Sequence, residues 1–150
     1  MLYEKGFFKD EDPSPGQMRK EKTFFPSPWS ETTQIDFEAI FFARVLSRSP
    51  DNIDVLRRQG ELLSIKGEHQ QALEIDRRLV RLLPKDCIAF YNLACSLSKN
   101  ELYSEALLVL RAAIERGYDD FEYLAFDQDL ATLKKLPEFQ QLIDEHHLGG

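Results

Sequence analysis

Apolar residues recur at helical spacing along most of the chain, in runs that end at proline or glycine. The first run, 34–50, is apolar on nearly every side, which indicates a helix buried against more than one neighbour. Thr33 and Asp36 match a capping box, in which a hydroxyl accepts a hydrogen bond from the first turn. We therefore predict an all-α fold whose first helix starts directly after Thr33 and ends at Pro50.

Beyond Pro50 the pattern repeats at a fixed interval, because Pro50 and Pro84 both close a helical run. Each of the segments 53–86 and 87–120 divides into two amphipathic stretches. The four helices are expected at 53–66, 68–83, 87–99 and 103–116. A repeated helix pair of this length is typical of a solenoid, since one pair alone cannot bury its apolar stripe.

These two segments resemble tetratricopeptide repeats. The first copy of the pattern is Leu56, Gln59, Gly60, Leu63, Ala72, Asp76 and Pro84, and the second is Phe90, Leu93, Ala94, Leu97, Ala106, Leu110 and Tyr118. The resemblance implies a short right-handed α-solenoid of helix-turn-helix repeats. Within the helical domain, 34–147, it implies the outer helix of a partial repeat (34–50), two repeats (53–86 and 87–120) and a C-terminal cap (121–147). Asp76 departs from the pattern, because it stands where an aromatic residue is usual.

The segment 1–33 differs from the rest, because it combines four prolines with many aromatic residues. Proline disfavours helix at its own position and at the one before it, so we expect an extended N-terminal arm. The aromatic residues of the arm are Tyr3, Phe7, Phe8, Phe24, Phe25 and Trp29. We predict that they cover an exposed face of the helical domain and that removing 1–33 lowers the melting temperature.

The chain is acidic, with a net charge of −7 from 26 acidic and 19 basic side chains. An acidic surface disfavours nucleic acid and anionic membranes as partners. No run reaches the roughly 20 apolar residues of a membrane span, and no secretory signal core is seen at the start. We therefore predict a cytoplasmic protein. Cys87 and Cys95, which lie two helical turns apart on one predicted helix, are too distant for a disulfide.

No group of residues has the spacing that catalysis, a metal or a cofactor requires. The three histidines, His69, His146 and His147, lack zinc-ligand spacing. Acidic residues cluster between 119 and 129, but without the glycine of a calcium-binding loop, and helix capping explains them more simply. We predict no enzyme activity, no metal and no cofactor.

In proteins of the tetratricopeptide family, the first helix of each repeat lines a concave groove that takes extended or helical peptides. By this resemblance the groove residues would be Asp54, Arg57, Arg58, Glu61, Ser64, Ile65, Ile88, Tyr91, Asn92, Cys95, Ser98 and Lys99. Asn92 is suited to clamp a peptide backbone, and the forked donors of Arg57 and Arg58 are suited to a carboxylate. Ile88 and Tyr91 would offer apolar anchors.

The leading hypothesis is a non-catalytic adaptor that binds a peptide or a partner protein in this groove. A second is a small secretion-type chaperone that shields an apolar segment of an exported client. A third is a self-assembling structural subunit in which the aromatic arm docks into a neighbouring copy. The family's clamp for acidic chaperone tails is disfavoured, because Glu61 and Cys95 occupy its asparagine positions.

Overall fold

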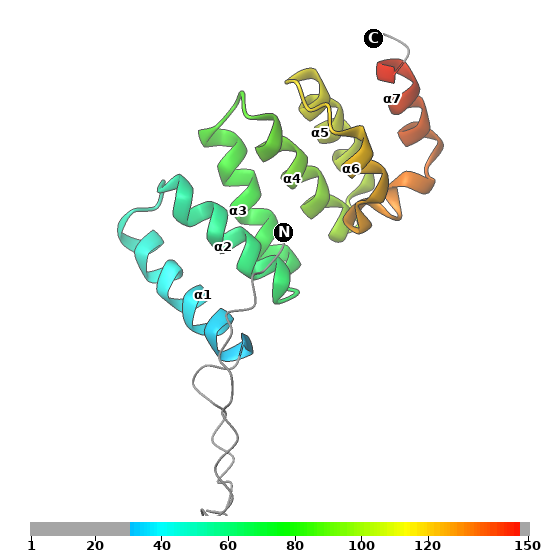
Figure 1. The fold of residues 1–150 in the computed structure, drawn as a ribbon. Coiled ribbons are helices and arrows are strands. Elements are labelled where there is room, and N and C mark those ends of the chain that lie inside the picture. The colour runs from blue at the N-terminus through cyan, green and yellow to red at the C-terminus, as the bar shows by residue number, and fades with distance from the viewer. Residues whose placement is uncertain (1–30, 148–150) are drawn as a thin grey trace, which may run out of the picture.

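The computed structural model describes residues 31–147, and this part of the chain is helical without any strand, which confirms the all-α prediction. Figure 1 shows the helices side by side in a row that follows the chain, from α1 at one end to α7 at the other. The α-helices are α1 (Glu31–Arg48), α2 (Ile53–Ile65), α3 (His69–Leu82), α4 (Cys87–Lys99), α5 (Tyr103–Glu115), α6 (Phe121–Phe126) and α7 (Pro137–His147). Two short 3-10 helices, η1 (Gln128–Leu130) and η2 (Leu133–Lys135), join α6 to α7.

The helices start at regular intervals. The interval from Ile53, which begins α2, to Cys87, which begins α4, is the same as the interval from His69 of α3 to Tyr103 of α5. One further interval of the same length leads from Cys87 to Phe121, the first residue of α6. The four helix positions expected from the hydrophobic pattern are confirmed to within one or two residues.

The first helix departs from the sequence prediction in two ways. It begins at Glu31, so Thr33 lies inside its first turn and the predicted capping box is wrong. Among the described elements its extensive contacts are with α2 alone, so these elements do not bury it on more than one side as the sequence predicts. Phe37, Ile40 and Phe41 are exposed as a result.

Side-chain caps start several of the remaining helices. Asn52 accepts a hydrogen bond from the Val55 backbone N–H at 3.1 Å, and Asp86 caps α4 by accepting from two backbone N–H groups. The turn after α2 places Gly67 at φ 76°, and the equivalent turn after α4 places Glu101 at φ 62°. Glycine adopts this left-handed conformation at little cost, whereas glutamate does not.

The core runs along the row of helices, and the segment after α5 completes it. Leu56, Leu97 and Leu110 come from the repeated helix pairs, whereas Leu130 and Leu133 come from the 3-10 helices, and all five are fully buried. The segment that follows α5 therefore contributes part of the core. Most of the predicted N-terminal arm, residues 1–30, lies outside the described residues. The covering of an exposed face by its aromatic side chains therefore stays a prediction.

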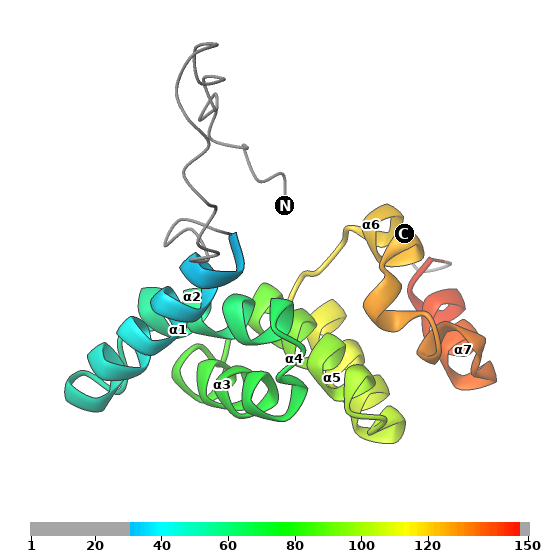
Figure 2. The same ribbon diagram turned by 90° about the horizontal axis from the view of Figure 1, so that it is seen from below.

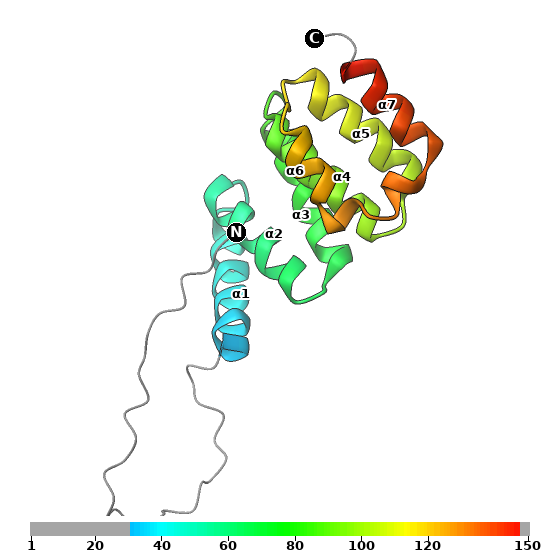
Figure 3. The same cartoon turned by 45° about the vertical axis from the view of Figure 1, so that its right-hand side comes forward.

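After α5 the chain crosses to the side of the row opposite α3 and α5, where it forms α6 (Figure 2). In Figure 2, seen from below, α3 and α5 lie on one side of α4, while α6 lies on the other. Figure 3 shows α6 in front of α4, with α7 beside α5. The face of the row formed by α2 and α4 is thus extended by α6, and we call this side of the row the inner face (Figure 2).

Candidate functional site

Nine of the twelve predicted groove residues reach solvent. Asp54, Glu61, Ile65, Ile88 and Asn92 are exposed. Arg57, Arg58, Ser64 and Lys99 are half-buried. The remaining three, Tyr91, Cys95 and Ser98, are buried, so the prediction that they line an open groove is wrong.

Tyr91 is buried because residues after α5 cover it. Its ring stacks on Tyr118, with the ring centroids 4.3 Å apart and an interplanar angle of 6°. The ring centroid of Tyr123 on α6 lies 6.2 Å from that of Tyr91. Its hydroxyl donates a hydrogen bond of 2.6 Å to Asp127 Oδ2. Burial raises the pKa of the Tyr91 phenol far above its ordinary value. Tyr91 therefore fastens α4 to the end of α6 and cannot serve as an anchor for a partner.

Cys95 lies one turn further along α4 and contacts the same carboxylate. Its Sγ donates to Asp127 Oδ2 at 3.6 Å. Burial, followed by the charge of Asp127, raises the pKa of the Cys95 thiol well above its ordinary value. A protonated, buried thiol is a poor nucleophile. Both Cys95 and Cys87 are free thiols.

The donor atoms of Cys95, Asp127 and Asp129 all lie within 4.8 Å of one another, which makes them the candidate metal ligands among residues 31–147. Bonds within the protein already account for this cluster. Asp127 accepts from Tyr91, and Asp129 forms an ion pair of 3.0 Å with Lys99. A neutral thiol beside carboxylates that are already paired does not favour a metal site.

The basic residues of the predicted groove are also engaged within the chain. Arg57 pairs with Asp86 at 2.7 Å, and Arg58 pairs with Glu38 of α1 at 2.8 Å. The hypothesis that these two arginines hold a partner's carboxylate is therefore weakened, because each already holds one.

Lys99, the last residue of α4, bonds to residues on two other elements. Its Nζ donates to Ser64 Oγ of α2 at 2.9 Å and pairs with Asp129 of η1. It thereby joins α4 to both α2 and η1.

Two helices of the inner face, α4 and α6, carry exposed apolar side chains. Ile88 and Asn92 lie one turn apart on the same side of α4, and 46% of Ile88 is exposed. On α6, Phe126 is 74% exposed. The predicted groove omits Phe126, although it stands one repeat interval after Asn92 and the repeat spacing alone would have found it.

Asp76, which breaks the aromatic pattern of the repeat, is buried between α3 and α4. Ser96 Oγ donates a hydrogen bond to its Oδ2. Burial raises the pKa of Asp76 to about 6, against the opposing effects of the Ser96 hydrogen bond and the Lys99 charge. Gly60 of α2 packs closely against α3 at this point, because a Cβ added to Gly60 would lie 3.5 Å from Asp76 Oδ1 and 3.3 Å from Ile75 Cγ2. The aromatic position of the pattern is thus filled here by a polar contact between helices.

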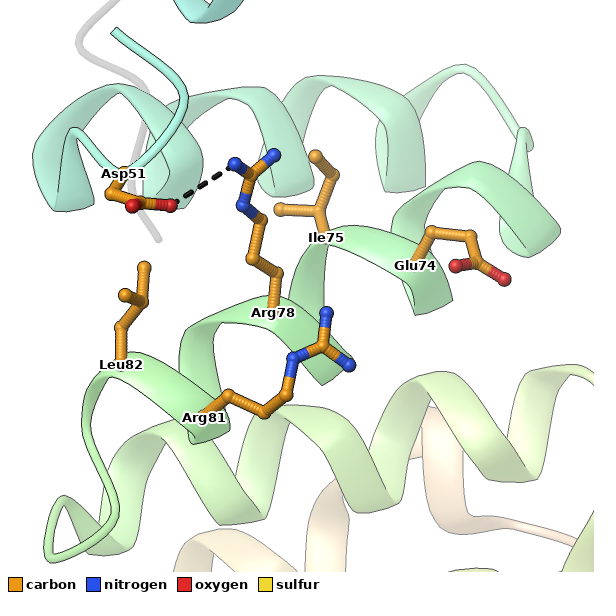
Figure 4. Close-up of a pocket in the computed structure, with 6 residues that line it drawn as sticks. All are labelled: Asp51, Glu74, Ile75, Arg78, Arg81 and Leu82. Atoms are coloured by element: carbon orange, nitrogen blue, oxygen red, sulfur yellow. Dashed lines mark hydrogen bonds and ion pairs between the residues drawn. The ribbon is translucent and has the colours of Figure 1, made fainter.

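A separate pocket of about 420 Å³ lies beside α3. Figure 4 shows Asp51, Ile75, Arg78 and Leu82 around it, with Arg78 reaching towards Asp51, to which it is ion-paired at 3.0 Å. Arg81 and Glu74 complete the lining. Two acids offset two arginines, so the pocket favours neither an anion nor a cation.

Comparison with known proteins gives a partial likeness. No family model matches the chain. It is 33% identical over 91 residues to a protein of Arabidopsis thaliana whose name describes it as chloroplastic, and this alignment covers 59% of the chain and 27% of that protein. The likeness is therefore to a limited part of a longer protein. Within residues 31–147, no helix has both the length and the apolar character needed to cross a membrane.

Proposed function

We propose that residues 31–147 form a short right-handed α-solenoid of tetratricopeptide-like repeats, and that its inner face binds a segment of another polypeptide. Helix starts that recur at one constant interval, from Ile53 to Cys87 to Phe121, support the repeat assignment. Buried small residues at matching positions, Gly60 with Ala94 and Ala72 with Ala106, support it as well, because they let neighbouring helices approach closely.

The observation that carries the binding proposal is the exposure of Ile88 and Phe126 on α4 and α6. The hydrogen bond from Tyr91 to Asp127, the residue that follows α6, joins α4 to the end of α6. Asn92 is exposed on the same side of α4 as Ile88, and its amide can both donate to and accept from a peptide backbone. Apolar anchors beside a backbone-binding amide suit an extended peptide.

Charge indicates which peptides this face prefers. Its cations Arg57, Arg58 and Lys99 are paired within the protein, whereas Asp54 of α2 and Glu122 of α6 are exposed acids. The ligand we propose therefore has an apolar side chain flanked by lysine or arginine. Such a complex is expected to weaken as salt rises.

The proposed role is non-catalytic. The groups with the most strongly raised pKa values, Tyr91 and Cys95, are buried and bonded to Asp127. Asp76 is buried against Ser96. These contacts hold helices together, which explains the raised values without a reaction.

A peptide library with apolar and basic positions, read by fluorescence anisotropy, tests this proposal. Replacing Ile88 or Phe126 by aspartate is expected to weaken binding of the selected peptides by about tenfold or more, or about 1.4 kcal/mol. Leu108→Asp on α5 is the matched control, because 70% of Leu108 is exposed away from the inner face. Equal loss in all three variants, or none in the first two, would reject the inner face as the binding surface.

The compartment is tested separately. The sequence predicts a cytoplasmic protein, whereas the name of the Arabidopsis relative assigns that protein to the chloroplast. We propose the chloroplast as the alternative. Fractionation of cells that express the full chain distinguishes the two compartments.

A further inference from the structure

The exposed side of α1 carries three large apolar residues at adjacent positions of one helix face. Phe37 is 68% exposed, Ile40 is 60% exposed and Phe41 is 51% exposed. Their spacing of three and four residues places them side by side on the helix. We call these three residues the α1 patch. It lies at the free end of the row of helices, where α1 packs extensively on α2 alone among the described elements.

The size of the α1 patch argues against a second copy of the chain as its partner. Three such side chains, each exposed by more than half, offer roughly 350 Å². A stable interface between two proteins buries about 800 Å² on each partner. The α1 patch alone supplies less than half of that area. A tethered segment of the same chain needs less area, because it loses no translational freedom on docking.

The chain itself supplies a suitable segment. Residues 1–30 precede α1, and the part nearest to the helix, 24–29, has the sequence FFPSPW. It contains no charged residue and places Phe24, Phe25 and Trp29 close to the helix start. We call 24–29 the aromatic segment. The α1 patch spans about 6 Å of helix axis between Phe37 and Phe41, and six extended residues span roughly 20 Å, so the aromatic segment is long enough to cover it.

Two prolines in the aromatic segment, Pro26 and Pro28, favour such a docking. Proline restricts the backbone of the undocked chain, and this reduces the entropy lost when the segment is held in place. The residue before each proline is also biased towards extended conformations. We propose that the aromatic segment docks on the α1 patch of its own chain and acts as an N-terminal cap of the helical row.

Trp29 is the only tryptophan of the protein, so its fluorescence reports on this contact. In the full chain we expect blue-shifted emission and protection from acrylamide quenching, both unchanged when the protein is diluted. The triple variant Phe37→Ser, Ile40→Ser and Phe41→Ser is expected to shift the emission to the red and to remove the protection. All three side chains are already exposed, so the fold should survive, which far-ultraviolet circular dichroism checks.

Leu108→Ser is the matched control, and it should leave the Trp29 signal unchanged, since Leu108 is equally exposed but lies on α5. Three results would overturn the proposal. The first is a wild-type Trp29 as accessible as free tryptophan, and the second is a protected Trp29 that the triple variant does not release. The third is protection that disappears on dilution, which would assign the contact to a second copy of the chain. None of these results bears on peptide binding by the inner face.

Discussion

Asp76 gives the sharpest test of how the helical row is stabilised. Its carboxyl group is buried between α3 and α4 and accepts a hydrogen bond from Ser96. Burial raises its pKa from 3.8 to about 6. A group with a higher pKa in the folded state binds its proton more tightly there than in the unfolded state. The contribution of Asp76 to stability is therefore greatest below pH 4 and is lost as the pH rises through about 6.

A shift of about two pKa units corresponds to about 3 kcal/mol between the protonated and ionised states. At pH 7 most of this cost is present, because the carboxyl group is then largely ionised. In Asp76→Asn the amide oxygen still accepts the Ser96 hydrogen bond, and the buried charge is gone. We expect the variant to be more stable than the wild type at pH 7 by about 1–3 kcal/mol and to lose this advantage towards pH 4.

Urea denaturation of both proteins between pH 4.5 and 7.5 measures this difference directly. Other carboxyl groups titrate in the same range, but their effects are common to both proteins and cancel in the comparison. Asp54→Asn, at an exposed position of α2, is the matched control and should not stabilise the protein at pH 7, because it removes no buried charge. An Asp76→Asn protein less stable than the wild type at pH 7, or a difference that does not vary with pH, would refute the reasoning.

Three further predictions concern a backbone angle, a hydrogen bond and the burial of the two cysteines. Glu101→Gly should stabilise the fold by about 0.5–1 kcal/mol in thermal denaturation, because Glu101 has φ 62° and glycine relieves that strain; a loss of stability would contradict it. Tyr91→Phe removes the hydrogen bond to Asp127 and should cost about 1–2 kcal/mol in urea denaturation, whereas an unchanged midpoint would mean that the bond contributes nothing. In a thiol-reagent assay the half-buried Cys87 should react well before the buried Cys95, and equal rates would contradict the described packing.

The helices and their regular spacing could be predicted because they depend on local information. Periodic apolar residues, small residues at fixed positions and closing prolines are all visible in the sequence. The start of α1 could not be predicted in the same way. A capping pattern at Thr33 competes with residues that continue the helix back to Glu31, and the sequence does not show which prevails.

The groove was harder to predict because burial depends on contacts between distant residues. Tyr91 has the spacing of a surface residue on an inner helix, yet Tyr118 and Asp127, both far along the chain, cover it. Arg57 likewise has its partner, Asp86, 29 residues away. A periodic pattern gives the face on which a residue lies, but it does not reveal what packs against that face.

Asp76 illustrates the same limit within the core. The repeat pattern places an aromatic residue at this position, and the sequence alone offers no reason for an acid. The reason is Ser96 on the next helix, 20 residues away. A polar pair of this kind can be recognised only once both helices are placed.

Photocrosslinking from position 92 tests the central claim most directly. A photoreactive amino acid is introduced at the exposed Asn92 of α4, with the same substitution at Leu108 of α5 as the control, and the crosslinked peptides are identified by mass spectrometry. We predict adducts from position 92 on segments with an apolar residue flanked by lysine or arginine, and their loss when Ile88→Asp is added. The same partners captured from position 108, or adducts from position 92 that survive Ile88→Asp, would contradict binding on the inner face.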